Sequence, residues 1–595
     1  MRNFKFYSAA LAGVLMLGAC SSSDDLNGGA SGESVNTSYL AVNIQNVGVA
    51  PSSRASYEGG KGSYEDGTDA ESKINKVRFY FFNGDGTPYY VVNNTANSHV
   101  NYLDETVESN GQKHEETVEQ VTKAVLVLKG ETKTVPASVI AVINPDALDN
   151  TTLKSGEMTL SELRTAATGN KFYDSTNGFV MSNSVYEKAG QDVCSTPVAS
   201  NICASEDAAK AKPVDIYVER VVAKVNAKID AEYVRTGEKD KAWTVNADGK
   251  YQIQVGSIDV TNYDQTTNAN STTNTYPVYA VIQGWQIADA NGKAELCKQI
   301  NTAWYDGELG IQPWTTGDYH RSFWSMSVPF TSGAQGGVNR PVNKSFENIN
   351  LSLTKDFSST PVYTLPNTPI AVVTNPATST NDLTKLIVAA KLVYKDGDTY
   401  KPAQICEYKG LSYLGQDNVK KLIAGENSKF FKKTKGQDGS DVYTAISPSD
   451  IVFKTVSADD NSVKDYEVIA QLADNAGDIY VKDGENWKVT TKDEVNKALA
   501  TEAASVRSTD GDTYYYTPIK HLGSAGKLGE YGIVRNHSYQ VTIQNVKGFG
   551  TPVFDPKREI DPMVPSNDNT YLAARVNVLS WRVVSSSVNL DQTNK

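Results

Sequence analysis

The stretch Lys76-Val77-Arg78-Phe79-Tyr80-Phe81-Phe82-Asn83-Gly84-Asp85-Gly86 joins a strand to a turn. Residues 76–82 are rich in aromatic and β-branched side chains, which favour an extended strand. Residues 83–86 are of the types that favour tight turns. The same alternation of short apolar runs with Gly, Asn and Asp clusters continues through most of the chain. We therefore predict an all-β protein.

Further segments support this fold class. By the same criteria we predict strands at residues 124–128, 138–143, 217–229 and 539–546. Helical patterns are few: one covers residues 159–167, and another covers 492–504, where Val495 and Leu499 have helical spacing. The expected fold is all-β with a few short helices.

The length of the chain predicts more than one domain. The 595 residues exceed what a single core usually serves, and a hydrophobic content of 39% is sufficient for real cores. A polar stretch at residues 204–212 precedes a strand-like run, so we place a boundary near residue 217. The N-terminal domain is then 55–216 and the C-terminal domain 217–595. The polar region 415–515 is expected to be an elaboration that packs loosely on the second domain.

The N-terminus has the pattern of a bacterial lipoprotein signal peptide. A basic start leads into an apolar run over residues 6–17, and Leu17-Gly18-Ala19-Cys20 ends it. The run is too short to span a membrane, and small residues before Cys20 suit a signal peptidase. We predict a signal peptide at 1–19, lipidation at Cys20 and a flexible tether at 20–38. An ordinary secretory signal with a chance cysteine is the alternative.

A strand with one apolar face follows the tether. Leu40, Val42 and Ile44 alternate with polar or small residues, so this strand needs a partner sheet. The polar run after it contains Arg54, the only basic residue between Lys5 and Lys61. An arginine-specific protease would reach the bond between Arg54 and Ala55 easily.

The C-terminus is also strand-like. Residues 576–584 are rich in Val and Leu, and Val584, Val588 and Leu590 continue an apolar period of two. We expect a terminal strand without a fixed place in its own domain.

Charge and cysteines restrict the partners. The formal net charge of −12 argues against nucleic acid as a partner. Cys194 and Cys203 are close enough in sequence to form a disulfide in an oxidising compartment, or they stay thiols. Cys297 and Cys406 can be paired, buried or exposed.

No catalytic motif is complete. His114-Glu115-Glu116-Thr117-Val118 lacks the second histidine of a zinc-protease helix, and the other histidines have no ligand spacing. We expect no enzyme activity, no metal and no cofactor. Trp304, Trp314 and Trp324 could line a sugar-binding face, although core packing is the favoured interpretation.

Five segments together resemble the fimbrillins of type V pili, closest to minor fimbrial shaft subunits of the Mfa type. They are the lipobox 17–20, the first strand with its Arg54-Ala55 site, residues 74–82, residues 218–225 and residues 531–543. The last segment is the most specific.

The resemblance implies a fold, a location and an assembly route. The fold would be two transthyretin-like Greek-key β-sandwich domains. The precursor would be an outer-membrane lipoprotein, and an arginine-specific protease would cut after Arg54 in the propeptide 39–54. Loss of the first strand would open a groove, and the C-terminal donor strand of a neighbouring copy would fill it. Copies would form a head-to-tail fimbria with anchor and tip subunits.

Two alternatives differ in how they treat the first strand. A fimbrial anchor would keep its lipid and its first strand. A terminal accessory subunit would not need to donate its last strand. A glycan-binding surface lipoprotein would share the signal and the sandwiches but would not need a removable strand. The resemblance also implies that the fimbria supports cell adhesion, biofilm formation and virulence.

Overall fold

The structure of this protein is a computed structural model. It describes residues 36–47, 67–92, 99–106, 118–130, 134–148, 152–153, 156–169, 171–183, 186–188, 191–234, 242–264, 269–300, 325–328, 339, 342–373, 383–455, 467–501, 504–506, 510–521, 525–553, 555–560, 562, 571–579 and 584–587. In these residues strands far outnumber helices. The predicted all-β fold class is confirmed.

The N-terminal domain is built on one large sheet. Its strands are, in spatial order, β4 (His99–Val100), β3 (Val91–Val92), β6 (Val118–Gly130), β1 (Asn36–Val47), β15 (Val214–Arg220), β11 (Met181–Asn183), β7 (Ser138–Ile143), β2 (Lys76–Phe82) and β5 (Tyr102–Thr106), with β14 (Thr196–Pro197) on β7. Buried residues from both halves of the sheet, such as Leu126 in β6 and Phe79 in β2, share one core. The sheet therefore folds over on itself and encloses that core.

The C-terminal domain is a sandwich of two sheets. One has the order β23 (Val362–Thr364), β16 (Ala223–Ile229), β36 (Ser538–Lys547), β38 (Tyr571–Leu579) and β39 (Val584–Ser587). The other contains β37 (Thr551–Pro552), β35 (Asp512–Pro518), β24 (Lys385–Asp396), β19 (Ala269–Ala288), β18 (Tyr251–Asp264), β27 (Leu411–Leu414), β26 (Ile405–Tyr408), β34 (Ala504–Val506), β31 (Glu467–Leu472) and β30 (Ile451–Thr455), with β17 (Thr244–Val245) and β25 (Thr399–Pro402) at its side. Val541 and Trp285 come from different sheets and pack into the same core.

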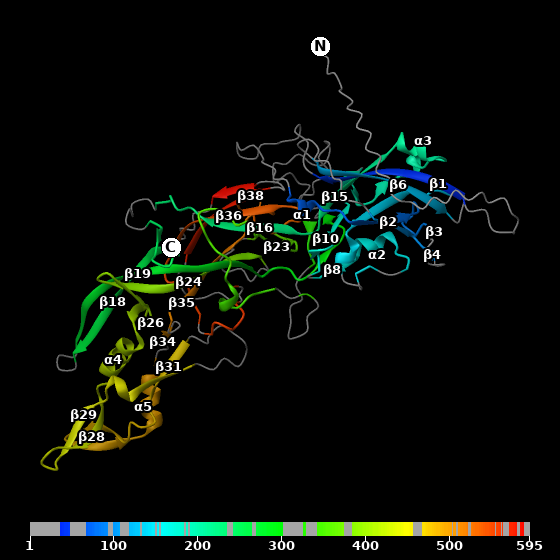
Figure 1. The fold of residues 1–595 in the computed structure, drawn as a ribbon. Coiled ribbons are helices and arrows are strands. Elements are labelled where there is room, and N and C mark those ends of the chain that lie inside the picture. Colours follow the sequence, from blue (N-terminus) through cyan, green and yellow to red (C-terminus); the bar gives the residue numbers. More distant parts are fainter. Residues whose placement is uncertain are drawn as a thin grey trace.

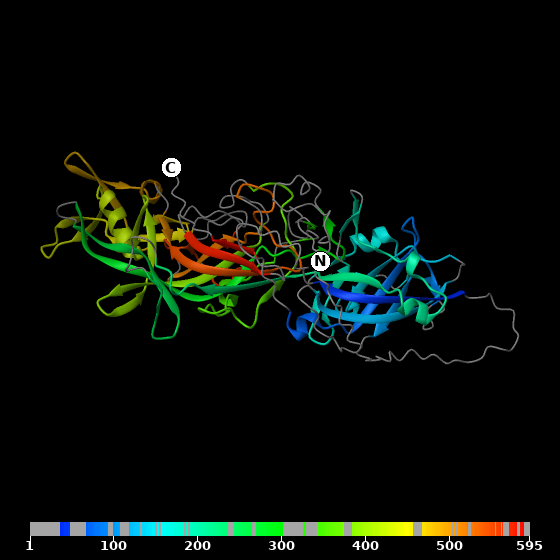
Figure 2. The same cartoon turned by 90° about the horizontal axis from the view of Figure 1, so that it is seen from above.

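The polar region that we expected to pack loosely has a hydrophobic core of its own. Val419 and Ile423 of α4 (Gln416–Glu426) and Val495 of α5 (Lys492–Leu499) are buried in it. A small sheet, β29 (Asp441–Ala445), β28 (Phe430–Lys435), β32 (Ile479–Asp483) and β33 (Asn486–Thr490), lies beyond the helices. We call residues 404–506 the distal module, because the molecule is elongated and this module lies at the end opposite the N-terminal sheet (Figure 1) (Figure 2).

Short elements complete the described part of the chain. The remaining helices are α1 (Asp69–Ser72), α2 (Leu160–Thr165) and α3 (Glu206–Lys210), with 3-10 turns at Pro145–Ala147, Ala199–Asn201, Phe346–Asn348 and Pro448–Asp450. Two-stranded pairs join β9 (Tyr173–Asp174) to β10 (Gly178–Phe179), β12 (Tyr186–Lys188) to β13 (Gln191–Val193), β8 (Ala167–Thr168) to β20 (Ala294–Glu295), and β21 (Gln299–Ile300) to β22 (Ser325–Met326). No helix in the described ranges is long and apolar enough to cross a membrane.

The predicted boundary near residue 217 falls inside a strand. β15 continues to Arg220 in the N-terminal sheet, and β16 begins at Ala223 in the C-terminal sheet. The change of sheet therefore occurs at Val221 and Val222, both fully buried. The single strand predicted for residues 217–229 is two strands, because the chain leaves one sheet and enters another without losing its apolar character.

Candidate assembly site

The first strand, β1, lies inside the N-terminal sheet. It pairs antiparallel with β6 on one side and parallel with β15 on the other. Leu40 is 0% exposed and Val42 is 1% exposed, and both belong to the domain core. The backbone of Ile44, the third predicted residue, pairs with Thr122 and Ile216. Without β1, two strands would each present an unpaired backbone edge, which is a template for another strand.

The walls of this position are apolar. Leu126, Leu128, Ile216 and Val218 come from the two flanking strands and are fully buried in the same core. A strand between β6 and β15 points every second side chain toward this core, so a strand with apolar residues at alternate positions fits there. We call the space between β6 and β15 the β1 seat.

Polar contacts also hold β1. The backbone N–H of Tyr39 donates to the Cys203 carbonyl at 2.8 Å, and the Cys203 N–H donates to the Tyr39 carbonyl at 2.9 Å. The Asn43 side-chain amide donates to the Asp215 carboxylate at 2.9 Å. These contacts use surface-accessible chain on either side of the buried residues, so β1 is held over its length.

The predicted lipidation and cleavage residues lie outside the described residues. Cys20, Arg54 and Ala55 fall there, and so do Val588 and Leu590 of the predicted donor strand. Val584 starts β39, which pairs with β38 through Val578. The start of the predicted donor strand therefore has a place at the edge of its own C-terminal sheet.

A buried polar cluster joins the two domains. The Arg220 guanidinium donates to the Glu71 carbonyl at 2.8 Å and to the Asn536 side-chain oxygen at 3.2 Å. The Glu71 carboxylate accepts a hydrogen bond from Tyr363 at 2.6 Å and forms an ion pair with Lys224 at 3.2 Å. Burial opposes ionisation of Glu71, but Lys224, Tyr363 and backbone N–H donation together hold the pKa of its carboxyl below its usual value.

A second set of contacts reinforces this junction. The Arg535 guanidinium donates to the carbonyl of Leu296 at 2.7 Å and to that of Glu295. Lys298 forms an ion pair with Glu219 at 2.9 Å, and both side chains are almost fully buried. Residues 294–298 thus reach from the C-terminal domain into the N-terminal core. The distinctive segments 218–225 and 531–543 therefore meet at this junction, and no local pattern in the sequence indicates that contact.

Of the two possibilities for Cys194 and Cys203, a disulfide or two thiols, the structure has the thiols. Cys194 contacts Cys297 instead. The hydrogen bond between the two thiols, which favours the protonated form of Cys297, and complete burial raise the pKa of the Cys297 thiol. Cys406, whose state the sequence left open, is a buried thiol in the distal module, and burial raises its pKa to about 12.

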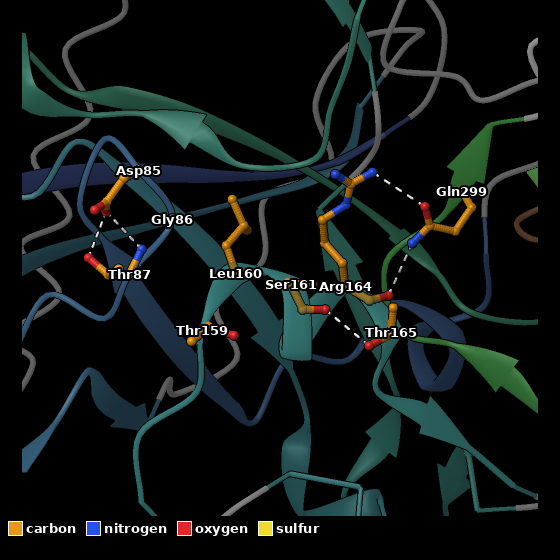
Figure 3. A pocket seen from close by; sticks show the side chains of 9 residues that line it. All are labelled: Asp85, Gly86, Thr87, Thr159, Leu160, Ser161, Arg164, Thr165 and Gln299. Atoms are coloured by element: carbon orange, nitrogen blue, oxygen red, sulfur yellow. Dashed lines mark hydrogen bonds between the residues drawn. The ribbon is translucent and has the colours of Figure 1, made fainter.

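A pocket of about 550 Å³ opens beside α2 (Figure 3). It is lined by Asp85, Gly86, Thr87, Thr159, Leu160, Ser161, Arg164, Thr165 and Gln299. The Thr87 hydroxyl and N–H donate to the Asp85 carboxylate and lower its pKa, so this carboxylate is a poor proton donor. Arg164 donates to Gln299 at 3.3 Å. The polar groups of the lining thus pair with one another, Thr87 with Asp85 and Arg164 with Gln299.

Two histidines that are separated in sequence come together. The rings of His521 and His537 lie 5.2 Å apart, and His521 Nδ1 is 2.9 Å from the Tyr539 hydroxyl. Within the described ranges no group of three or more His, Cys, Asp or Glu side chains could hold a metal ion. Trp304, Trp314 and Trp324 lie outside those ranges.

The comparison with protein families gives one match. Residues 508–587 match the C-terminal region of the family described as "Major fimbrial subunit protein type IV, Fimbrillin". This segment contains β35 to β39, and therefore Val584 and the strand β36 that meets the domain junction. No curated protein sequence matches the chain.

Several solved structures align over most of the chain at low similarity. A fimbrilin from Porphyromonas gingivalis W83 is 11% identical, with 94% of this chain and 100% of that chain covered and a TM-score of 0.33. The tip fimbrial protein Mfa3 from Porphyromonas gingivalis, truncated at its C-terminus, is 9% identical, with 91% and 99% covered and a TM-score of 0.29. A fimbrial assembly protein from Parabacteroides distasonis is 8% identical, with 76% and 99% covered and a TM-score of 0.24. Because these TM-scores are below 0.5, these alignments carry no argument, and the family match applies to residues 508–587.

Proposed function

We propose that this chain is a fimbrillin, a subunit protein of cell-surface fimbriae, and that it is a shaft subunit of the Mfa type that polymerises by strand exchange. The family match over residues 508–587 supports this proposal. In this proposal the precursor is exported as a lipoprotein modified at Cys20, and an arginine-specific protease cuts between Arg54 and Ala55. The role is structural, with no enzyme activity. Copies of the chain, together with anchor and tip subunits, are its partners.

The position of β1 carries the proposal. Cleavage after Arg54 would separate β1 from the rest of the chain, since β1 ends at Val47 and the next described residue is Gly67. Only hydrogen bonds and packing would then retain it. Loss of β1 would leave the β1 seat open, lined by apolar residues that are costly to expose, at ~1.5–3 kcal/mol for each fully buried side chain.

The C-terminal donor strand has the apolar residues needed to cover the β1 seat. Val584, Val588 and Leu590 share one parity, as Leu40 and Val42 do, so one face of the C-terminal segment would enter the core. Backbone pairing with β6 and β15 would add about 1 kcal/mol net for each hydrogen bond. The contact is head-to-tail, and such a contact grows into a filament when it does not close into a ring.

Proteolysis would control this assembly. While β1 occupies its seat, a donor strand would have to displace a strand that is covalently part of the same chain. After cleavage, the fragment that carries β1 keeps the lipid at Cys20 but is no longer tied to the domain, whereas neighbouring subunits in a fimbria stay at high effective concentration. The precursor is therefore expected to be monomeric and the cleaved form polymeric.

The test is to purify the protein sheared from its own cells, with the natural sequence or with Arg54→Ala. The mature natural chain should start at Ala55 and give a ladder on an unheated denaturing gel that collapses on heating. Arg54→Ala should leave a longer, monomeric chain. Lys61→Ala is the matched control, because it removes the next basic residue and should change nothing. A lipidated natural chain that starts at Cys20 and gives no ladder would instead identify an anchor or a glycan-binding lipoprotein.

A further inference from the structure

The four-stranded sheet of the distal module has one face on the core and one face outside. Phe430 and Ile479 are 4% and 2% exposed and pack into the module's core. Phe431 and Tyr480 follow them in the same strands and pair directly across β28 and β32. Because successive side chains of a strand point to opposite faces, Phe431 and Tyr480 lie on the outer face.

Four aromatic side chains gather on this outer face, which we call the aromatic face: Phe431, Tyr443, Tyr480 and Trp487. The Tyr443 and Trp487 rings are stacked, with centroids 4.1 Å apart and planes 7° apart. Phe431 meets Trp487 edge-on at 4.8 Å, and Tyr480 meets Tyr443 edge-on at 5.3 Å. All four are partly exposed, so the rings form a preformed surface that does not have to be ordered on binding.

Cationic side chains border the rings. The Lys433 ammonium lies 5.9 Å from the ring centroids of both Tyr443 and Tyr480. Lys433 and Lys435 each form an ion pair with Asp441. Lys482 pairs across the strands with Trp487 and is exposed on the same face. Three ammonium groups against one carboxylate make this face positive on a chain whose net charge is −12.

The location of the face separates it from the proposed strand exchange. β28 and β29 lie at the far end of the distal module, at the opposite end of the molecule from β1 and β6 (Figure 1). The aromatic rings belong neither to the N-terminal core nor to the sandwich core. Neither the fold of the two main domains nor the β1 seat requires aromatic side chains here.

We propose that the aromatic face is a binding site for an acidic carbohydrate. The apolar C–H face of a sugar ring stacks on the exposed parts of the Trp487 and Tyr443 rings, and its sulfate or carboxylate groups pair with Lys433, Lys435 and Lys482. Flat rings and ammonium groups on one rigid sheet suit a ligand that is itself flat on one side and anionic at its rim. An acidic peptide would instead pair its backbone with the edge strands β29 and β33.

The proposal can be tested by titrating the full chain with defined oligosaccharides in a calorimeter at low salt. The probes are a sulfated heparin hexasaccharide, an unsulfated hyaluronan hexasaccharide and neutral maltohexaose. We expect saturable binding of at least one acidic probe and none of the neutral one. Affinity should fall as salt is raised, because surface ion pairs are screened. Comparison of the two acidic probes shows whether sulfate or carboxylate is preferred.

Variants locate the site. Trp487→Ala should lower the affinity by about tenfold or more, as expected for loss of one stacking contact. Lys433→Gln and Lys482→Gln should each lower the affinity and weaken its salt dependence. Neither lysine is in the module's core, so these two variants remain informative if Trp487→Ala unfolds the module. Tyr400→Ala is the matched control, since Tyr400 is also exposed and has Lys395 5.9 Å from its ring, but lies on β25.

Several outcomes would overturn the proposal. One is the absence of saturable binding to both acidic probes. Another is equal loss of affinity in Tyr400→Ala and Trp487→Ala, which would indicate binding elsewhere. Equal binding of polyglutamate, with the same dependence on Lys433, would assign the face to acidic peptides. Light scattering gives the last such outcome. If the wild type is a dimer and Trp487→Phe a monomer, and neither binds sugar, the aromatic face belongs to an interface with a second copy of the chain.

Discussion

Leu40 in β1 lies directly opposite Leu126 in β6, and both side chains are fully buried. The proposed cleavage would therefore remove Leu40 and leave its direct neighbour Leu126 in place. Removal of β1 would expose Leu126 and its neighbours to water unless another strand took its place. The core of the N-terminal domain is therefore also the surface on which the proposed assembly depends.

A peptide should replace β1. We expect a protein that begins at Ala55 to melt at a lower temperature than the full chain, and a peptide of residues 580–595 to raise its melting temperature in a concentration-dependent way, because a ligand of the folded state stabilises it. Differential scanning calorimetry measures this. A peptide with Val588→Asp and Leu590→Asp should have no effect. Equal stabilisation by both peptides, or by neither, would contradict strand exchange at the β1 seat.

Glu71→Gln should destabilise the domain junction. The change leaves Lys224 buried without its carboxylate, and breaking such a pair costs about 3 kcal/mol in free energy of unfolding. The ion pair is between side chains that are 8% and 1% exposed. Urea unfolding at pH 7 measures the loss. Glu206→Gln is the control, since its pair with Lys210 is at the surface and should leave stability unchanged.

The same residue predicts a pH dependence. The pKa of Glu71 is lower in the folded protein than its usual value of about 4.3. Its contribution to stability is therefore complete above the unfolded pKa and is lost as the pH falls through the folded pKa. The stability difference between wild type and Glu71→Gln should be constant from about pH 5 to 7 and should shrink below about pH 4. A difference that grew on acidification would contradict the ionised state of Glu71.

A disulfide should form between the two cysteines that lie in the N-terminal core, Cys194 and Cys297. Oxidation of the folded protein by oxidised glutathione should join Cys194 to Cys297. The two thiols give up two protons and two electrons, and the oxidant leaves as two molecules of reduced glutathione. Non-reducing peptide mapping identifies the pair. Cys297→Ser should abolish the link, whereas Cys203→Ser should preserve it. A peptide linking Cys194 to Cys203 would support the interpretation from the sequence instead.

The distal module should respond to mutation locally. Leu422 is 5% exposed in its core, and Leu422→Ala should cost about 2–5 kcal/mol of the module's stability. Hydrogen exchange should then rise in residues 404–506 while β2 and β7 stay protected. Lys421→Ala, its neighbour on α4, should change little. A uniform increase across both main domains would show that the module does not unfold as a separate unit.

Local patterns alone determined several elements. The predicted strands at residues 76–82 and 138–143 coincide with β2 and β7. In α2, Thr159 accepts a hydrogen bond from the N–H of Glu162, and Glu162 accepts one from the N–H of Thr159, so its start is encoded within four residues. Side-chain alternation and capping act over a few residues, and for that reason the sequence reveals them. The helix α4 was missed, although Val419, Leu422 and Ile423 have helical spacing.

Only the tertiary structure decided which distant residues meet. The strand predicted over residues 217–229 changes sheet at Val221, Cys194 contacts Cys297, and Arg220 meets Glu71 and Asn536. The aromatic face likewise needs four strands to bring Tyr443 beside Trp487. The sequence by itself determined strand and turn tendencies, the composition of the termini and the alternating face of β1. It could not determine these pairings, because each depends on the burial of surface from segments far apart in the chain, and no local pattern encodes that choice.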